Sequence, residues 1–220
     1  MNKKIKNRFA IFASGNGSNA LNLLSYTSRY LENSKVVCLL SDNPEAPIIS
    51  KIKNDFSHVP VFVIPLKKSL NEKYSVAKKR QEMAILEKLK SLSVNWISLA
   101  GYMKILSEDF ISLFHQEVCG ISYDKKTLNR IINIHPSLLP KFPGKDAYRQ
   151  AFESNEKSSG VTVHFVDGGV DTGQIIVQEK FQRKENDTLD KFTQRGLQTE
   201  YELYPKVFQM IDENKLGNNL

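Results

Sequence analysis

The segment from 133 to 144 carries the residue types best suited to chemistry. It reads Asn-Ile-His-Pro-Ser-Leu-Leu-Pro-Lys-Phe-Pro-Gly and follows a short, mostly apolar stretch at 130–132. Asn133 and His135 are two residues apart, so on a strand their side chains would share one face. Three prolines then prevent both further strand pairing and an ordinary helix, so the chain must turn beside this pair. Such an amide and imidazole can stabilise an oxyanion and move a proton, although they could instead satisfy carbonyl groups of the turn.

Strand and helix patterns alternate along the rest of the chain. Strands are predicted at 9–14, 35–41, 59–64, 96–100, 131–134, 161–166 and 174–181, and helices at 19–30, 70–92 and from about 187 to 212. This alternation indicates an α/β protein with an open, mainly parallel twisted sheet and helices on both faces. Such sheets bind ligands at the carboxyl ends of their strands, which is where the Asn133 and His135 pair is expected.

Two helices are predicted in more detail. The helix at 70–92 is expected to start with the capping pattern Ser69-x-x-Glu72. Its buried face is predicted from apolar spacing to hold Val76, Met83, Leu86 and Leu89. Pro205 is expected to bend the last helix, and the residues at 42–47 are typical of a turn.

Composition limits the class of protein. The 220 residues, 40% hydrophobic and 25% charged, fit one domain over 1–220. No apolar run reaches the roughly 20 residues of a membrane helix, and the basic start at 1–8 precedes an apolar run too short for a secretory signal, so a cytoplasmic protein is expected. Cys38 and Cys119 are far apart, which suggests neither a disulfide nor a metal site. The net charge of +7 comes from scattered lysines, a pattern that favours a solvated surface attracting small anions over a nucleic-acid partner.

Four segments, 13–19, 99–106, 133–144 and 160–171, together resemble the family of folate-dependent formyltransferases, in the order found in that family. The resemblance covers nearly the whole chain and implies a Rossmann-like formyltransferase fold. It implies a half that binds the phosphate of a nucleotide at about 1–100 and a folate-binding and catalytic half at about 101–220.

The resemblance also implies an activity. The expected reaction is transfer of the formyl group of 10-formyltetrahydrofolate to the amine of 5-phosphoribosylglycinamide in purine biosynthesis, which gives formylglycinamide ribonucleotide and tetrahydrofolate. Asn133 and protonated His135 would donate hydrogen bonds to the formyl oxygen, while His135 also moves a proton from the amine toward N10. No metal is implied. The expected partners are small molecules, without nucleic acid or membrane, and the chain is expected to be a monomer or a homodimer.

The glycine-rich stretch 15–19 lies between the first strand and the first helix. Backbone N–H groups at a helix N-terminus favour an anion, although the glycines could serve only the tight turn. The stretch matches neither a Walker P-loop nor a full dinucleotide fingerprint. The resemblance assigns Gly17, Ser18 and Asn19 to the phosphate of the ribonucleotide.

The resemblance gives roles to further residues, and for each of them a purely structural role is the alternative. Asp171 lies in a glycine-rich loop where acidic residues are ordinary turn formers, and the resemblance places it beside His135, whose pKa a carboxylate would raise. His164 could be a buried structural histidine or line the same loop. Glu200 lies on an otherwise apolar stripe of the last helix. It could be a solvated residue at the edge of that stripe, or, by resemblance, a residue that contacts polar groups of the ribonucleotide.

The folate pocket is likewise assigned by resemblance. Its residues would be Met103, Lys104, Ile105, Leu106, Asn133, Val166 and Asp167. Packing in the core is the alternative for the apolar ones. The sequence does not decide which basic residue binds the glutamate of the folate, and the candidates are Lys78, Lys79 and Arg80.

Related activities are the main alternatives. Methionyl-tRNA formyltransferases need an added C-terminal RNA-binding domain and usually carry Arg-Gly in the proline turn, whereas this chain has Lys141-Phe142-Pro143-Gly144 and is expected to lack such a domain. Formyltetrahydrofolate deformylases carry an N-terminal regulatory domain, also not expected here. A nucleic-acid or nucleotide-binding module that kept the fold is the remaining alternative. The polar connection at 117–129 is predicted to be an insertion with no assigned function.

Overall fold

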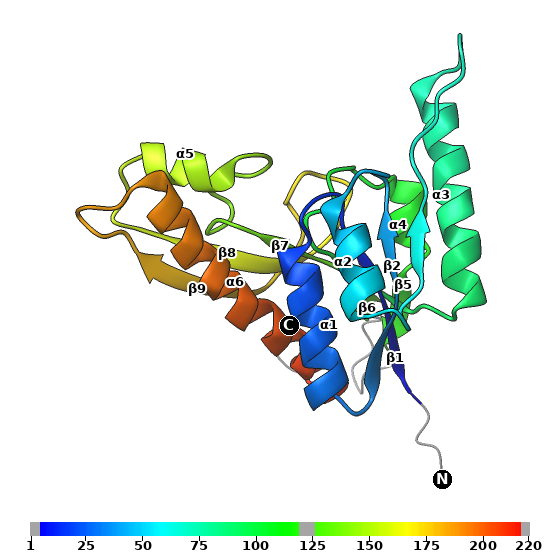
Figure 1. Cartoon of the computed structure of the whole chain (residues 1–220), viewed down its shortest axis with the longest axis horizontal. Helices are drawn as coiled ribbons and strands as arrows, with labels where there is room; N and C mark the ends of the chain where they lie inside the picture. Colours follow the sequence, from blue (N-terminus) through cyan, green and yellow to red (C-terminus); the bar gives the residue numbers. More distant parts are fainter. Residues whose placement is uncertain (1–4, 119–125, 217–220) are drawn as a thin grey trace. The chain divides into compact units, whose positions relative to one another are not determined.

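The computed structural model describes residues 5–118 and 126–216. The chain divides into two compact units, Met1–Lys104 and Ile105–Leu220, whose elements are labelled in Figure 1. The expectation of one domain over 1–220 stays a prediction.

The first unit holds a parallel sheet. Its strands are β1 (Asn7–Phe12), β2 (Ser34–Ser41), β3 (Val61–Val63) and β4 (Trp96–Leu99), in the order β3-β2-β1-β4. All three pairings are parallel, with Phe9 of β1 aligned with Val36 and Trp96 on its two neighbours. The last four residues of β1 are buried and apolar, as is typical of a strand covered on both faces.

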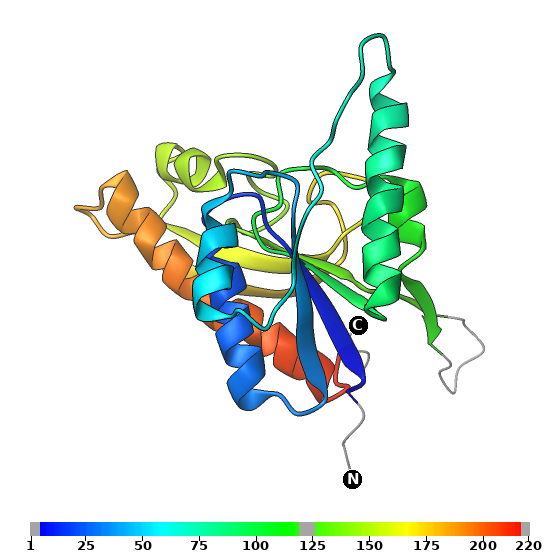
Figure 2. The same cartoon turned by 45° about the vertical axis from the view of Figure 1, so that its right-hand side comes forward.

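Three helices cover this sheet. Helix α1 (Ser18–Tyr30) and helix α2 (Pro47–Asp55) lie on one side of β1 and β2, and α3 (Tyr74–Ser91) lies on the other (Figure 2). Helix α2 was not predicted, and the predicted turn at 42–47 overlaps it at one residue only. Pro47 is its first residue, a position where proline is favoured, and Ile48, Ile49 and Ile52 are its buried face.

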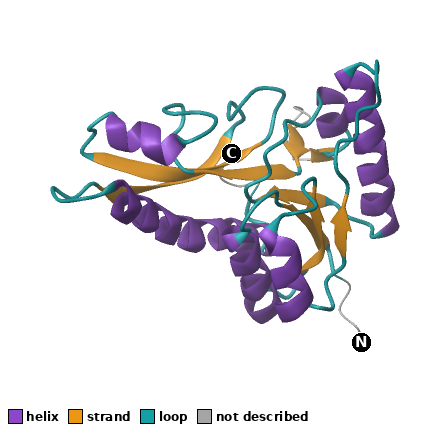
Figure 3. Ribbon diagram, turned by 45° about the horizontal axis from the view of Figure 1, so that its top comes forward, coloured by secondary structure: helices purple, strands orange, loops and turns teal. Residues whose placement is uncertain are grey.

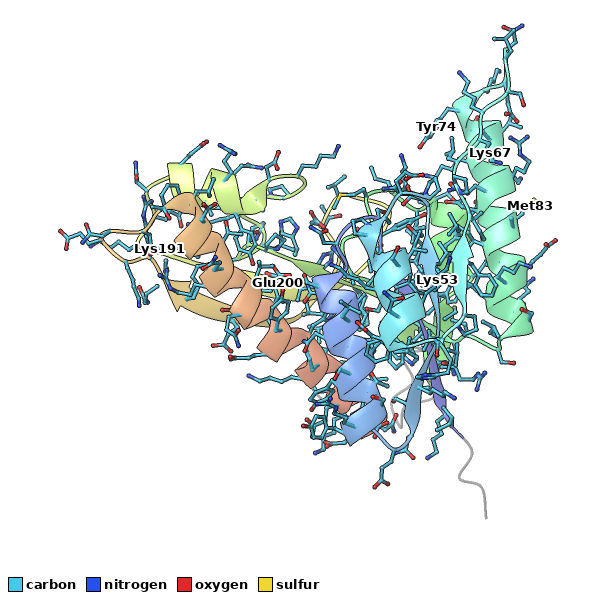
Figure 4. The ribbon with its side chains drawn as sticks, in the orientation of Figure 1. Lys53, Lys67, Tyr74, Met83, Lys191 and Glu200 are labelled. Carbon is cyan, nitrogen blue, oxygen red and sulfur yellow. The ribbon has the colours of Figure 1, made fainter. Side chains whose placement is uncertain are left out.

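Helix α3 differs from its predicted form. It begins at Tyr74 after the N-cap residue Lys73, whereas Ser69 and Glu72 form a separate turn in which Glu72 accepts a hydrogen bond from the Ser69 N–H at 2.9 Å. The predicted buried face is wrong at Val76 and Met83, which are 53% and 58% exposed, and right at Leu89, which is 1% exposed. Met83 is labelled in Figure 4.

The face of α3 that is buried holds Ala77, Gln81, Glu82, Ile85 and Leu89. Gln81 belongs there because its side-chain amide donates to the Ile64 carbonyl at 2.7 Å. An apolar pattern cannot identify a buried face that includes polar residues, which explains the error.

The second unit holds an antiparallel sheet. Strands β7 (Ile131–His135), β8 (Ser158–Phe165) and β9 (Ile175–Gln182) lie in the order β7-β8-β9. Helix α6 (Leu189–Asp212) runs along β8 and β9 (Figure 3), with buried side chains that include Phe192, Leu203 and Phe208. The Thr188 hydroxyl caps its first turn by accepting from the Lys191 N–H at 3.3 Å. The predicted α/β class is confirmed, whereas the bend at Pro205 stays a prediction.

Two short helices and a strand pair complete this unit. Helices α4 (Glu108–Ser112) and α5 (Ala147–Glu153) were not predicted. Strands β5 (His115–Val118) and β6 (Lys126–Asn129) pair antiparallel, and they overlap the two ends of the segment 117–129 that was predicted to be an insertion. Residues 119–125, and with them Cys119, lie outside the described residues. Within the described part of the chain, no helix is both long and apolar enough to cross a membrane.

Candidate active site

Strand β7 places Asn133 and His135 on one face. Their apolar neighbours Ile132 and Ile134 are buried on the other face, as the alternation of a strand requires. The antiparallel register aligns Asn133 with His164 on β8, and directly opposed residues share a face of the sheet. His164 therefore joins the pair predicted from the sequence, and it does so through a strand register that the sequence does not reveal.

Asp171 completes a cluster with these three side chains. Its carboxylate lies 3.1 Å from His135 Nδ1, 3.4 Å from His164 Nε2 and 3.3 Å from Asn133 Nδ2. The Gly144 N–H, from the proline-rich turn, donates to the same carboxylate at 2.8 Å. The structure thus brings together the residues predicted to be catalytic, and the turn that follows β7 helps to fix them.

The loop that carries Asp171 is tightly folded. Asp171 has a left-handed backbone with φ of 55°, which aspartate tolerates better than most residues. A Cβ at Gly173 would lie 1.8 Å from the Phe165 carbonyl oxygen, so only glycine allows the chain to return to β8 this closely. The acidic residue is therefore more than a turn former, because its carboxylate points back to two histidines.

His135 is buried between two hydrogen-bond acceptors. Nδ1 faces Asp171, and Nε2 lies 2.8 Å from the Phe142 carbonyl oxygen. Burial lowers the pKa of His135, against the raising effects of the Phe142 carbonyl and the Asp171 charge, and the net pKa is below its ordinary value. Asp171 thus acts in the direction that the resemblance implied. The two acceptors together favour the imidazolium, which has a hydrogen on each nitrogen, whereas burial favours the neutral imidazole and sets the net direction of the pKa.

Asp171 remains a carboxylate at neutral pH. Burial by itself raises the pKa of Asp171, but hydrogen bonds from His164 and the Gly144 N–H, together with the charge of His135, bring its pKa below the ordinary value. A neutral imidazole beside an ionised carboxylate can accept a proton and then hold it as imidazolium.

The Asn133 amide is hydrogen-bonded within the cluster. His164 Nδ1 lies 2.7 Å from the Phe165 carbonyl oxygen, which requires a hydrogen on Nδ1. His164 Nε2 lies 3.2 Å from the Asn133 amide nitrogen and 3.4 Å from the Asp171 carboxylate. To donate to a ligand oxygen, the Asn133 amide must turn one N–H away from His164 or Asp171.

In the first unit, the glycine-rich loop precedes α1. Gly17 has φ of +65°, and a Cβ there would lie 2.4 Å from Ile48 Cγ1, whereas a Cβ at Gly15 would meet nothing within 4 Å. The fold by itself thus requires glycine at 17. Lys51 of α2 donates to the Asn16 carbonyl at 3.1 Å, which places an ammonium group beside the first turn of α1, where Ser18 and Asn19 lie.

The residues assigned to folate differ in exposure. The side chains of Met103 and Ile105 are 63% and 60% exposed, which argues against core packing, whereas Leu106 is only 5% exposed and fits the core. Asp167 is exposed and accepts hydrogen bonds from the Thr172 hydroxyl and the Gly169 N–H of its own loop. Val166 is partly buried, and its carbonyl accepts from the Asn129 amide.

Glu200 is not a solvated edge residue. Its side chain lies on α6 (Figure 4), the residue is 5% exposed, and it accepts a hydrogen bond from the Tyr148 hydroxyl. Burial and the Glu200 charge both raise the pKa of Tyr148. Tyr148 was missed from the sequence because the packing of α5 on α6 brings it there; a Cβ at Gly196 would lie 2.1 Å from its ring.

Lys78, Lys79 and Arg80 are the candidates for binding the glutamate of the folate, and the structure distinguishes only Arg80 from the other two. Arg80 donates to the Glu72 carboxylate at 2.8 Å and to the Lys67 carbonyl at 2.6 Å, so it is already engaged. Over residues 5–118 and 126–216, no group of three or more His, Cys, Asp or Glu side chains is placed to hold a metal ion.

An α/β fold that presents a His–Asp pair beside an amide is suited to acid–base chemistry. The family model of formyl transferases matches residues 7–208. The chain therefore belongs to the formyl transferase family.

Individual relatives of this chain are members of the same family. The chain is 37% identical over 211 residues to phosphoribosylglycinamide formyltransferase from Bacillus subtilis. This alignment covers 96% of this chain and 97% of that protein. The chain is 32% identical over 209 residues to the Haemophilus influenzae protein of the same name, covering 95% and 89% of the two chains. The crystal structure of phosphoribosylglycinamide formyltransferase from Bacillus halodurans has 35% identity and a TM-score of 0.76, over 90% of this chain and 92% of that one.

Proposed function

We propose that this protein transfers the formyl group of 10-formyltetrahydrofolate to the amine of 5-phosphoribosylglycinamide. The products are formylglycinamide ribonucleotide and tetrahydrofolate. The observation that carries the proposal is the His135–Asp171 pair, 3.1 Å apart beside Asn133. Relatives named for this activity, aligned over 89% or more of their length, support the choice of substrates.

The chemistry follows from this pair. The amine attacks the formyl carbon, and charge develops on the formyl oxygen, where the Asn133 amide would donate a hydrogen bond. Neutral His135 takes the proton that the amine loses, at Nε2 once this atom leaves the Phe142 carbonyl, and passes it to N10 as the C–N bond to the folate breaks. Asp171 holds Nδ1–H and stabilises the imidazolium in between. Once protonated, His135 can also donate from Nε2 to the formyl oxygen, which is the role that the resemblance implies.

The remaining roles are proposed for each unit. In the first unit, Gly17, Ser18 and Asn19 bind the substrate phosphate with backbone groups at the start of α1, and Met103 and Lys104 contact the folate. In the second unit, Ile105, Leu106, Asn133, Val166 and Asp167 contact the folate and Glu200 contacts the ribonucleotide. The setting proposed is the cytoplasm, with small molecules as partners.

The variant His135→Ala tests the proposal. Loss of such a group should lower kcat by about 100- to 1,000-fold, with formylated ribonucleotide identified by mass spectrometry. His58→Ala, which removes an exposed histidine of the first unit, is the matched control and should keep wild-type turnover. Near-normal turnover by His135→Ala would contradict the role of this residue, and no formylated product from the wild-type protein would contradict the proposed function.

A further inference from the structure

Ser14 lies where three parallel strands of the first unit end. It follows β1, Asp42 follows β2, and the turn from Gly101 to Lys104 follows β4. The carboxyl ends of parallel strands are the ligand-binding edge of such a sheet. Neither Ser14 nor Asp42 has a role in the mechanism described above, although both are nearly buried, at 9% and 8% exposure.

Ser14 holds the turn after β4 through two hydrogen bonds. Its backbone N–H donates to the Gly101 carbonyl at 3.0 Å, and its Oγ accepts from the Met103 N–H at 3.0 Å. Gly101 between them has φ of +78°, so the turn needs the freedom of glycine. The Met103 side chain is largely exposed, so the backbone contact to Ser14, rather than core packing, fixes this residue.

Asp42 fixes the direction of the Ser14 hydroxyl. The single hydroxyl hydrogen donates to Asp42 Oδ1 at 2.5 Å, so a lone pair of Oγ is left to face the Met103 N–H. A charged acceptor makes this bond stronger than a neutral one. The other carboxylate oxygen lies 4.0 Å from Lys104 Nζ. One carboxylate therefore acts on both Met103, through Ser14, and Lys104.

We propose that Ser14 and Asp42 are positioning residues for the folate donor. They set the backbone path from Gly101 to Lys104, and thereby present Met103 and Lys104 to the folate. The inference rests on the proposed function, which assigns these two residues to the folate pocket. Asn43 supports the arrangement, because its side-chain amide donates to the Ser14 carbonyl at 3.1 Å.

The test is the affinity of Ser14→Ala for a stable 10-formyl folate analogue, measured by titration calorimetry without acceptor. Loss of the anchor should weaken donor binding about tenfold, the equivalent of one hydrogen bond. In turnover assays the KM for the donor should rise to the same extent, with kcat and the KM for the ribonucleotide changed by less than about twofold. Asp42→Asn, which keeps an acceptor for Ser14 but loses the charge, should fall between the wild type and Ser14→Ala.

Ser34→Ala is the matched control. Ser34 is equally buried, at 4% exposure, and accepts from the Asn7 amide at 3.2 Å, but it lies at the opposite end of β2. It should lower the thermal midpoint about as much as Ser14→Ala and leave donor affinity unchanged.

The outcomes separate the two proposals. Wild-type donor affinity in Ser14→Ala, or an equal loss of donor and ribonucleotide affinity, would overturn the positioning role. A wild-type protein that binds the analogue but forms no formylated ribonucleotide would overturn the proposed function alone, since donor binding is measured without acceptor. A wild-type protein that does not bind the analogue would overturn both.

Discussion

His135 and Asp171 determine how the proposed reaction depends on pH. His135 must be neutral to take the proton of the amine, so the rate falls as the pH falls through its pKa. Burial sets that pKa below the ordinary value, while the Asp171 charge raises it. The position of the acid limb of the rate profile is therefore a balance between burial and one carboxylate.

Replacing Asp171 with asparagine removes the charge that raises the pKa of His135. The acid limb of the kcat/KM profile of Asp171→Asn should move to lower pH, and kcat should fall because the imidazolium loses its partner. Asp190→Asn, a change at an exposed aspartate of α6, should leave the profile in place. An acid limb of Asp171→Asn at the wild-type pH would refute the tuning role.

Sequence could predict part of this cluster. The i, i+2 spacing of Asn133 and His135 follows from strand geometry, and the contacts of Asp171 with His135 agree with the family resemblance. For His164 the sequence left two alternatives open, because its place beside Asn133 depends on the β7–β8 register. Tyr148 could not be found either, because its contact with Glu200 joins residues 52 apart in the chain.

At the scale of elements, the loop between β1 and α1 depends on one of its two glycines. Gly17→Ala would place a Cβ against Ile48 in a left-handed backbone and should lower the free energy of unfolding by about 1–3 kcal/mol. Gly15→Ala has open space and should cost less than about 1 kcal/mol. Urea unfolding of the two variants measures the difference, and equal losses would show that the contact with Ile48 is not the cause.

Helix α3 shows why a buried face can be misassigned from sequence. The apolar residues Val76, Met83, Leu86 and Leu89 predicted one stripe, but the face that packs holds Gln81 and Glu82 as well as Ile85 and Leu89. Strand β1 was predicted from its continuous buried run, whereas β5 and β6 were not predicted. The short helices α4 and α5 were missed because five to seven residues carry too little periodicity to be recognised.

The two faces of α3 should respond differently to truncation. Ile85 is fully buried, so Ile85→Ala should lower the free energy of unfolding by about 2–4 kcal/mol. Met83→Ala removes a side chain that is 58% exposed and should cost less than about 0.5 kcal/mol. Chemical denaturation of both variants is the measurement. A loss for Met83→Ala that matches that for Ile85→Ala would contradict the assignment of the faces.

At the scale of the whole molecule, the net charge of +7 should assist the capture of anionic substrates. The kcat/KM for the ribonucleotide should therefore fall several-fold between about 50 and 300 mM salt, as screening shortens the reach of the field. The dependence should be similar for two salts of the same valence. A kcat/KM that is independent of ionic strength would assign the charge to the solvated surface alone.

The proposed function requires the protein to select 5-phosphoribosylglycinamide as the acceptor of the formyl group. The most direct measurement follows the release of folate from a 10-formyl folate by absorbance, with 5-phosphoribosylglycinamide, with methionyl-tRNA and with no acceptor. Release is expected with the ribonucleotide only. Release without an acceptor would indicate a deformylase, release with methionyl-tRNA would indicate a different acceptor, and no release in any of the three would contradict formyl transfer altogether.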